Sequence, residues 1–143
     1  MHDVEDLASI AVDRSLYLHR QVGPGMLESA YETILAELLL RAGLRVERQV
    51  PIRISCDDIV VAEGFRADLV VERRLLIELK SIERLNAVHG KQVLTYLRFM
   101  NLPLGLLINF GAPVLREGLR RIVNNHHDTA NSPLAINRPA VQI

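Results

Sequence analysis

The sequence predicts an α/β fold in which helices cover a mixed β-sheet. Two amphipathic helical patterns come first, several short strand patterns follow, and a helix, a strand and a further helix complete the chain. Helices and strands in this order are typical of a sheet layered by helices. With 143 residues, of which 49% are hydrophobic, the chain is long enough to fold as one domain around one core.

Two helices are predicted before Gly43. From residue 3 to about residue 20, apolar residues recur at helical spacing, and acidic residues stand in the first turn, where the helix dipole favours them. Glycine and proline at positions 23–25 interrupt this pattern. It resumes from Met26 to about Ala42 and ends at the glycine that follows. The two helices are therefore expected to form a hairpin.

Between Leu44 and Ile82 the pattern changes to that of strands. The segments VERQVPIRIS, IVVAEG, FRADLVVE and RLLIELKS alternate or run apolar, and short polar or glycine-bearing turns separate them. We therefore expect each segment to form a strand next to the others. Pro51 has no N–H to donate to a ladder, so it is expected at a sheet edge or a bulge.

A helix, a strand and a last helix are predicted in the remaining chain. Asn86 can cap a helix over about 87–100, PLGLLINF forms a short apolar strand, and 114–123 has the pattern of a final helix. Beyond residue 124 the periodicity is lost. We expect residues 1–124 to form one domain and residues 125–143 to form a C-terminal tail that is mobile or loosely packed.

Composition narrows the classes of function. Lys+Arg and Asp+Glu balance at 17 each, so no global positive field attracts a polyanion, and any nucleic-acid site must be local. The single cysteine, Cys56, excludes an internal disulfide and a multi-cysteine zinc site and fits a reducing compartment. The N-terminus is acidic, unlike a signal peptide, and no apolar run reaches the ~20 residues that cross a bilayer. We expect a cytoplasmic protein without membrane association.

Charged residues within apolar strands form the candidate site. Glu78 and Lys80 stand two residues apart in LLIELK, so they project from the same face of the strand. Asp68 lies among aliphatic residues of the strand before. A lone acid in a strand is more often exposed and without function, but a buried carboxylate needs pairing, hydrogen bonds or a metal. Two carboxylates suit Mg²⁺, and Lys80 could orient a metal-bound water or neutralise charge on a phosphate.

The start of the second helix could add an acid to this site. Glu28 and Tyr31 lie one turn apart on one face, although the helix dipole explains an acid there equally well and Tyr31 could belong to the core. Glu28 and Glu32 carry like charge four residues apart, which is mildly unfavourable. One of them is therefore expected to have a partner elsewhere.

The helix after Asn86 carries a polar stripe of His89, Gln92 and Tyr96 on one face. A histidine that binds metal needs further ligands, which are missing here, so His89 is expected to be a hydrogen-bonding or surface group. For Gln92 and Tyr96, packing and a place at the site are evenly balanced.

Taken together, these segments resemble the GxxExxY proteins, a branch similar to the PD-(D/E)xK nuclease superfamily. The naming motif is complete as Gly25, Glu28 and Tyr31, and GFRADLVVE, LLIELKS and HGKQVLTYL follow in the expected order. The similarity extends from about residue 5 to about residue 124. It implies a restriction-endonuclease-like fold, in which a central mixed β-sheet is flanked by α-helices. Ala67 stands before the aspartate, where the superfamily name has proline.

The resemblance also implies a set of catalytic residues, namely Glu28, Asp68, Glu78, Lys80, Gln92 and Tyr96. Asp68 would be the motif aspartate, and Glu78 and Lys80 would be the ExK pair. Glu28 would be the acid of the first core helix, and the remaining two would match polar positions of the helix after the ExK strand. In this superfamily such residues bind Mg²⁺ and hydrolyse phosphodiester bonds.

We therefore expect a metal-dependent nuclease that acts on DNA or RNA with Mg²⁺, or Mn²⁺ in its place. Asp68 and Glu78 would bind the metal, Glu28 would assist through the metal or its waters, and Lys80 would position the attacking water. One alternative is a catalytically inactive, nuclease-like module that binds nucleic acid or protein. Another is a structural protein whose acids are paired by arginines such as Arg66. The sequence leaves open the choice of DNA or RNA and whether the chain forms a homodimer.

Overall fold

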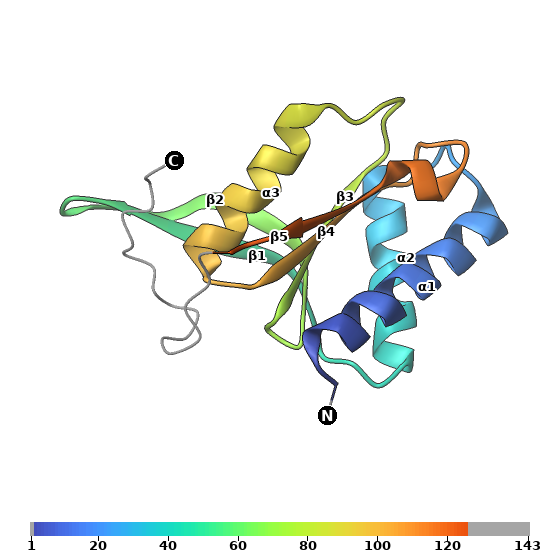
Figure 1. Ribbon diagram of the computed structural model, residues 1–143, viewed down its shortest axis with the longest axis horizontal. Helices are drawn as coiled ribbons and strands as arrows, with labels where there is room; N and C mark the ends of the chain where they lie inside the picture. The colour runs from blue at the N-terminus through green and yellow to red at the C-terminus, as the bar shows by residue number, and fades with distance from the viewer. Residues whose placement is uncertain (1, 126–143) are drawn as a thin grey trace.

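The computed structural model describes residues 2–125, and the expected tail from residue 126 onward lies outside them. The helices are α1 (Val4–Val22), α2 (Glu28–Arg41), α3 (Ala87–Met100) and the 3₁₀ helix η1 (Leu115–Gly118). The strands are β1 (Val46–Cys56), β2 (Ile59–Val71), β3 (Leu75–Lys80), β4 (Leu104–Asn109) and β5 (Leu119–Val123) (Figure 1). Among the described residues, no helix combines the length and the apolar character needed to span a membrane.

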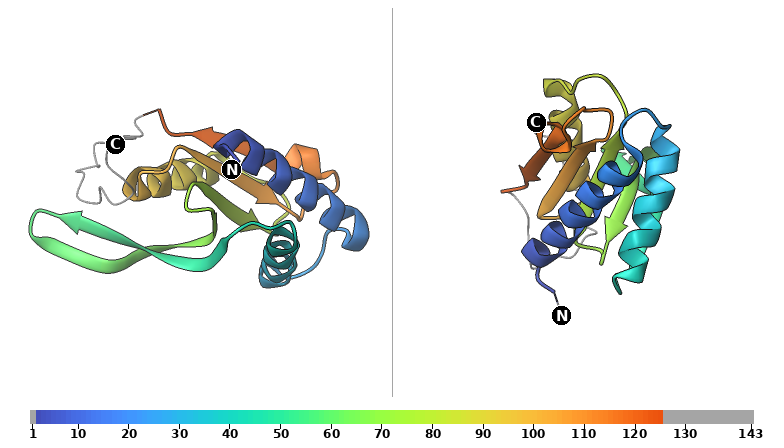
Figure 2. Two further views of the ribbon diagram at one scale, coloured as in Figure 1. Left: turned by 90° about the horizontal axis from the view of Figure 1, so that it is seen from below. Right: turned by 90° about the vertical axis from the view of Figure 1, so that its right-hand side faces the viewer.

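Within residues 2–125, five strands form one mixed sheet in the order β1-β2-β3-β4-β5. β3 and β4 are parallel, with α3 as the connection between them, and the other neighbouring strands are antiparallel. Helices α1 and α2 cover one face of the sheet and α3 covers the other (Figures 1 and 2). The predicted α/β fold with a central mixed sheet flanked by helices is confirmed.

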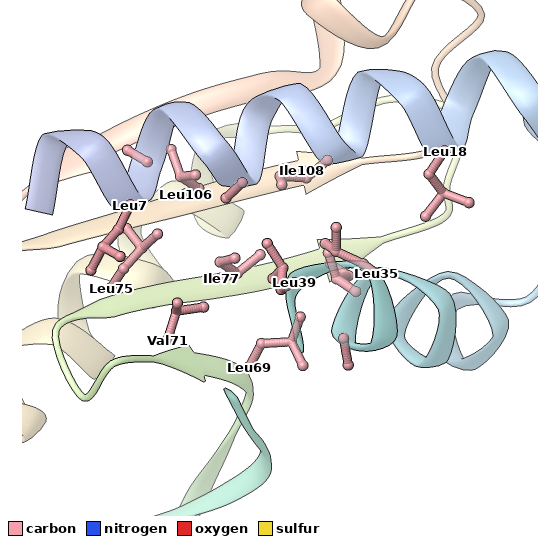
Figure 3. Packing of buried hydrophobic residues seen from close by; sticks show 14 of the residues in the cluster. Leu7, Leu18, Leu35, Leu39, Leu69, Val71, Leu75, Ile77, Leu106 and Ile108 are labelled. Carbon is pink, nitrogen blue, oxygen red and sulfur yellow. The ribbon is translucent and has the colours of Figure 1, made fainter. Parts of the chain in front are cut away.

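Alternation along β3 divides its side chains between two cores. Leu75 and Ile77 pack with α1 and α2 (Figure 3). Leu79 belongs to the same cluster, whereas Leu76 packs with α3. Each of these four side chains is fully buried. Because successive strand residues point to opposite faces, Glu78 and Lys80 share the face of Leu76, beneath α3. The strand pattern therefore places the candidate acid and lysine on the α3 side of the sheet.

The segments IVVAEG and FRADLVVE form a single strand, β2, so the prediction of two strands was wrong. Gly64 lies inside this strand and does not end it. A Cβ at Gly64 would lie only 2.1 Å from Cδ1 of Ile54 on β1, so the missing side chain makes room for the isoleucine across the hairpin. A glycine within a strand often marks a place where another part of the chain packs closely, and Gly64 is such a glycine.

The helix predicted over 114–123 was also wrong. Only Leu115–Gly118 is helical, as one 3₁₀ turn, and the chain then forms β5. β5 pairs antiparallel with β4, from Ile108 opposite Leu119 to Leu104 opposite Val123. This pairing satisfies the backbone groups on the outer side of β4, and the gain outweighs the local helical pattern.

Pro51 lies on β1, the edge strand of the sheet, one residue before a register shift between Ile52 and Ile54. The prediction of an edge or bulge position is confirmed. Proline is tolerated on an edge strand because only one side of such a strand is paired. The β1–β2 hairpin continues past Pro51 and extends away from the body of the molecule (Figure 2).

Candidate active site

The turn that leads into α2 is held by Tyr31. Its ring is fully buried and stacks on Phe110 with the ring centroids 4.5 Å apart. Its hydroxyl donates to the carbonyl of Gly23 at 2.5 Å and accepts from the amide of Met26 at 3.2 Å. The tyrosine therefore fixes both ends of the turn that contains Gly25, whose φ of 110° favours glycine. Glu28 begins the helix directly after this turn.

The chain that leaves β3 is held by Asn109, a buried residue at the end of β4. Its side-chain oxygen accepts from the amides of Ile82 and Gly111, each at 3.0 Å, and its side-chain nitrogen donates to the carbonyl of Ile82 at 3.0 Å. Ser81 adds a link to the turn before α2, because its hydroxyl donates to the carbonyl of Met26 at 2.7 Å. These bonds bring the start of α2 and the end of β3 together.

Asp68 and Glu78 lie opposite each other where β2 and β3 separate. The last ladder pair on this side is Leu69 with Ile77, and beyond it side chains take over the cross-strand bonds. The amide of Asp68 donates to Oε1 of Glu78 at 2.9 Å, and the amide of Leu79 donates to Oδ2 of Asp68 at 2.8 Å. Each ionised carboxylate keeps further lone pairs that can accept a ligand. The structure thus brings the two predicted acids together.

Burial disfavours ionisation of both acids. Glu78 has only 7% of its surface exposed, and burial first, then the Asp68 charge, raise its pKa to about 8. Burial also raises the pKa of Asp68, although hydrogen bonds from Leu79 and Gln49 lower it. Perturbed carboxyl groups held this close are frequent at catalytic and metal-binding sites.

Glu28 and Lys80 lie within electrostatic range of the pair. Glu28 is exposed as a residue, but partial burial of its carboxyl group and the charge of Asp68 raise its pKa. The charge of Lys80 counteracts this, lowering the pKa of all three acids, Glu28, Asp68 and Glu78. The ammonium group of Lys80 therefore acts electrostatically on acids from three different elements.

Tyr96 of α3 also faces this group. Burial, followed by the charges of Glu78 and Asp68, raises the pKa of Tyr96, and its ring packs against Phe65 at 4.7 Å between centroids. Gln92 stands one turn earlier on the same helix and is exposed, and its side chain forms no hydrogen bond within residues 2–125. The charges of Glu78 and Asp68 therefore act on Tyr96. Gln92 lies on the same face of α3 as Tyr96, and within the described residues no electrostatic effect links it to the two acids.

Two polar residues of the same region are engaged elsewhere. Nδ1 of His89 accepts from the amide of Asn86 at 3.0 Å, which completes the capping box of α3. His89 is therefore a hydrogen-bonding group, as the sequence indicates. Arg66 pairs with Glu63 at 2.5 Å on its own strand, and this gives no support to the alternative in which Arg66 neutralises the acids.

Two further residues of the site were missed by the sequence reasoning, Glu32 and Gln49. Glu32 is buried, with Oε2 3.1 Å from Nε of Arg48 and Oε1 2.5 Å from Nε2 of Gln49. The same Gln49 nitrogen lies 3.2 Å from Oδ1 of Asp68. The like charges of Glu28 and Glu32 did indicate an outside partner for one of them, but no sequence signal pointed to Gln49.

A family model described as the PD-(D/E)XK nuclease superfamily matches residues 5–122. The chain belongs to this superfamily. No curated protein and no solved structure matches it. The superfamily predicted from the motifs is thereby confirmed, and its membership supports a nuclease with a nucleic-acid substrate. The GxxExxY branch stays a prediction from the sequence motif.

PD-(D/E)XK nucleases generally use divalent metal ions, and the acids of this chain fit such an ion. Mg²⁺ takes one or two protein carboxylates and completes its shell with waters and phosphate oxygens. Within residues 2–125, no group of three or more His, Cys, Asp or Glu side chains is placed to hold a metal ion. The pair of Asp68 and Glu78 matches the requirement of Mg²⁺ for one or two carboxylates.

Proposed function

We propose that this protein is a metal-dependent nuclease that hydrolyses phosphodiester bonds in DNA or RNA. The observation that carries the proposal is the pairing of Asp68 and Glu78 at the separation of β2 and β3, with Lys80 on the same face of β3. An acid pair buried to this degree opposes folding unless a ligand offsets its charge. A divalent cation, Mg²⁺ or Mn²⁺, provides that offset.

When bound, the divalent ion supplies a water of lowered pKa and offsets negative charge on the phosphate. Asp68 and Glu78 would hold the ion through carboxylate lone pairs that their hydrogen bonds to the backbone amides and to Gln49 leave unused. Lys80 positions the attacking water and stabilises the charge that develops on the phosphate. Glu28 would assist through the ion or its waters. Gln92 and Tyr96 orient these groups or the nucleic-acid backbone.

A binding module that cleaves nothing is the competing proposal, and the balance of 17 basic and 17 acidic residues favours it. A module that only binds has little reason to keep buried acids that face a phosphate. The raised pKa values of Asp68 and Glu78 therefore favour the enzyme. Cleavage assays separate the two proposals.

The test compares the wild-type protein with Asp68→Asn. Asparagine keeps an oxygen that can accept from the amide of Leu79, so the fold is retained while one ligand charge is lost. We expect calorimetry to detect Mn²⁺ binding to the wild type and strongly weakened binding to the variant, with a matching loss of DNA or RNA cleavage. Glu63→Gln, an exposed acid of the same strand that pairs with Arg66, is the matched control and should behave as the wild type.

Equal and negligible Mn²⁺ binding by the wild type and Asp68→Asn would rule out the metal site. Metal-dependent binding of nucleic acid without cleavage would favour the binding module instead. Cleavage that survives undiminished in Asp68→Asn would place the activity elsewhere or in a contaminant.

A further inference from the structure

Gln49 has a backbone conformation that is unusual for a residue inside a strand. Its φ is 50°, in the left-handed region of backbone conformation that residues other than glycine and asparagine rarely adopt. In the ladder with β2, Arg48 pairs with Leu69 and Val50 pairs with Ala67, so Gln49 stands between these pairs, opposite Asp68. Such a strained residue persists only where its surroundings hold it, and it is often part of a functional site.

The strain has a visible result, because Arg48 and Gln49 both reach Glu32. Consecutive residues of a regular strand point to opposite faces and could not contact the same carboxylate in this way. The left-handed turn at Gln49 therefore brings both side chains to Glu32. It also leaves the Gln49 amide between Glu32 and Asp68.

The carboxyl group of Glu32 is held in place and differs in this from that of Glu28. Its exposed fraction is 6%, and each of its carboxylate oxygens accepts from a different donor, Oε2 from Arg48 and Oε1 from Gln49. Arg48 is itself held, since it also donates to the hydroxyl of Thr33 at 2.9 Å. Glu28 is exposed and forms no side-chain hydrogen bond within residues 2–125. Glu32 is therefore suited to hold a neighbour in place, and Glu28 is free to contact water.

The two carboxylates also determine which way the Gln49 amide points. Ionised carboxylates only accept hydrogen bonds, so the NH₂ group must face Glu32 and Asp68, with one N–H available for each. Oδ1 of Asp68 is then held by Gln49 at 3.2 Å and Oδ2 by the amide of Leu79 at 2.8 Å. Both oxygens of Asp68 are thus oriented, one from β1 and one from β3.

We infer that Glu32 and Gln49 form a positioning pair in which Gln49 orients the Asp68 carboxylate toward a divalent cation and Glu32 orients Gln49. The inference rests on the proposed function, because it assumes that Asp68 binds a metal ion. Neither residue of the pair touches the metal or the substrate. Partners that orient a ligating carboxylate in this way raise metal affinity by holding the ligand in its binding geometry.

Gln49→Gly tests the first step. Glycine adopts a φ of 50° without strain, so the substitution removes the side chain and leaves the backbone path unchanged. Calorimetry with Mn²⁺ should show an affinity about tenfold lower than that of the wild type. Asp57→Gly is the matched control, because Asp57 has a φ of 54° in the hairpin turn away from the site, and its Mn²⁺ affinity should equal that of the wild type. Circular dichroism establishes that each variant is folded.

Glu32→Gln tests the second step and guards against a Gln49→Gly protein that does not fold. A glutamine at position 32 can donate as well as accept, so the Gln49 amide is no longer forced to face Asp68. The variant should lose Mn²⁺ affinity on its own, but it should cause no further loss when Gln49 is already glycine. This non-additivity distinguishes action through Gln49 from general damage to the fold, which would add.

Unchanged Mn²⁺ affinity in Gln49→Gly overturns the inference and leaves the proposed metal site intact. Fully additive losses in the double variant overturn the role of Glu32. A wild-type protein that binds no Mn²⁺ removes the proposed function and the positioning pair together.

Discussion

The carboxyl groups of Asp68 and Glu78 each accept a hydrogen bond from a backbone amide of the neighbouring strand. The amide of Asp68 donates to Glu78 at 2.9 Å, and the amide of Leu79, next to Glu78, donates to Asp68 at 2.8 Å. The two carboxyl groups therefore stand in for the ladder bonds that β2 and β3 no longer make. Because these bonds need only acceptors, amide replacements retain them while removing charge. This separates the structural from the chemical role of each acid.

Glu78 makes the stability of the metal-free protein depend on pH. Its pKa rises from 4.5 to about 8 on folding, so across that window the unfolded chain releases a proton that the folded chain keeps. The free energy of unfolding should therefore fall as pH rises through this window and level off above about pH 8. Near pH 8, Glu78→Gln should be more stable than the wild type, and its free energy of unfolding should change less with pH. Urea denaturation with a chelator present, repeated across the window, measures both, and equal slopes would contradict the assignment.

Metal binding should release a proton. Near neutral pH, Glu78 is mostly protonated in the metal-free protein, whereas a ligating carboxylate must be ionised. Mn²⁺ affinity should therefore increase with pH until about pH 8 is passed. Titration calorimetry in buffers of different ionisation enthalpy should give different apparent enthalpies below that pH and matching ones well above it. Buffer-independent enthalpies at neutral pH would show that the ligands are already ionised.

Lys80 should affect the rate of cleavage more than the affinity for the metal ion. Lys80→Met keeps the length of the side chain but removes the ammonium group, and we expect cleavage to slow by about 100-fold or more. Mn²⁺ affinity should stay close to the wild-type value, because Lys80 is not a ligand. Lys91→Met, which removes the exposed lysine of α3, is the matched control and should have a much smaller effect on the rate. Parallel loss of rate and of metal affinity in Lys80→Met would assign Lys80 to the binding step.

Tyr31 should contribute to stability through its hydroxyl. Tyr31→Phe keeps the ring against Phe110 but removes both bonds to the turn before α2, at Gly23 and Met26. The carbonyl and amide lose a buried partner, so the free energy of unfolding should fall by about 1–3 kcal/mol. Tyr17→Phe alters an exposed tyrosine of α1 and should leave it unchanged. Denaturant titration of both variants checks this, and equal stabilities would mean that water replaces the hydroxyl.

Elements that depend on neighbouring residues were predictable from the sequence. The strand β3 and the helix α3 agree with their patterns, and the cap at Asn86 was found in advance, because each of these depends on a few consecutive residues. The same holds for Glu78 and Lys80, whose common face follows from the alternation of a strand. The motif residues also pointed to the superfamily whose family model matches the chain.

Elements that depend on distant pairing were not predictable from local pattern. The segment Leu119–Val123 has a helical pattern but forms β5, because β4 offers it a free edge. Gly64 resembles a turn residue but lies within β2, because Ile54 packs against it from the other strand of the hairpin. In both cases the deciding partner lies too far away in the sequence to affect a local pattern.

The sequence by itself determined the class of fold and the acids Asp68 and Glu78, because side-chain periodicity and a short motif are written into consecutive residues. Only the tertiary structure decided how the Asp68 carboxylate is held. That depends on a left-handed backbone at Gln49 and on the packing of α2 against β1, which brings Glu32 to the same amide. Contacts of this kind join residues from separate elements, and their free energy becomes available only when the whole domain is folded.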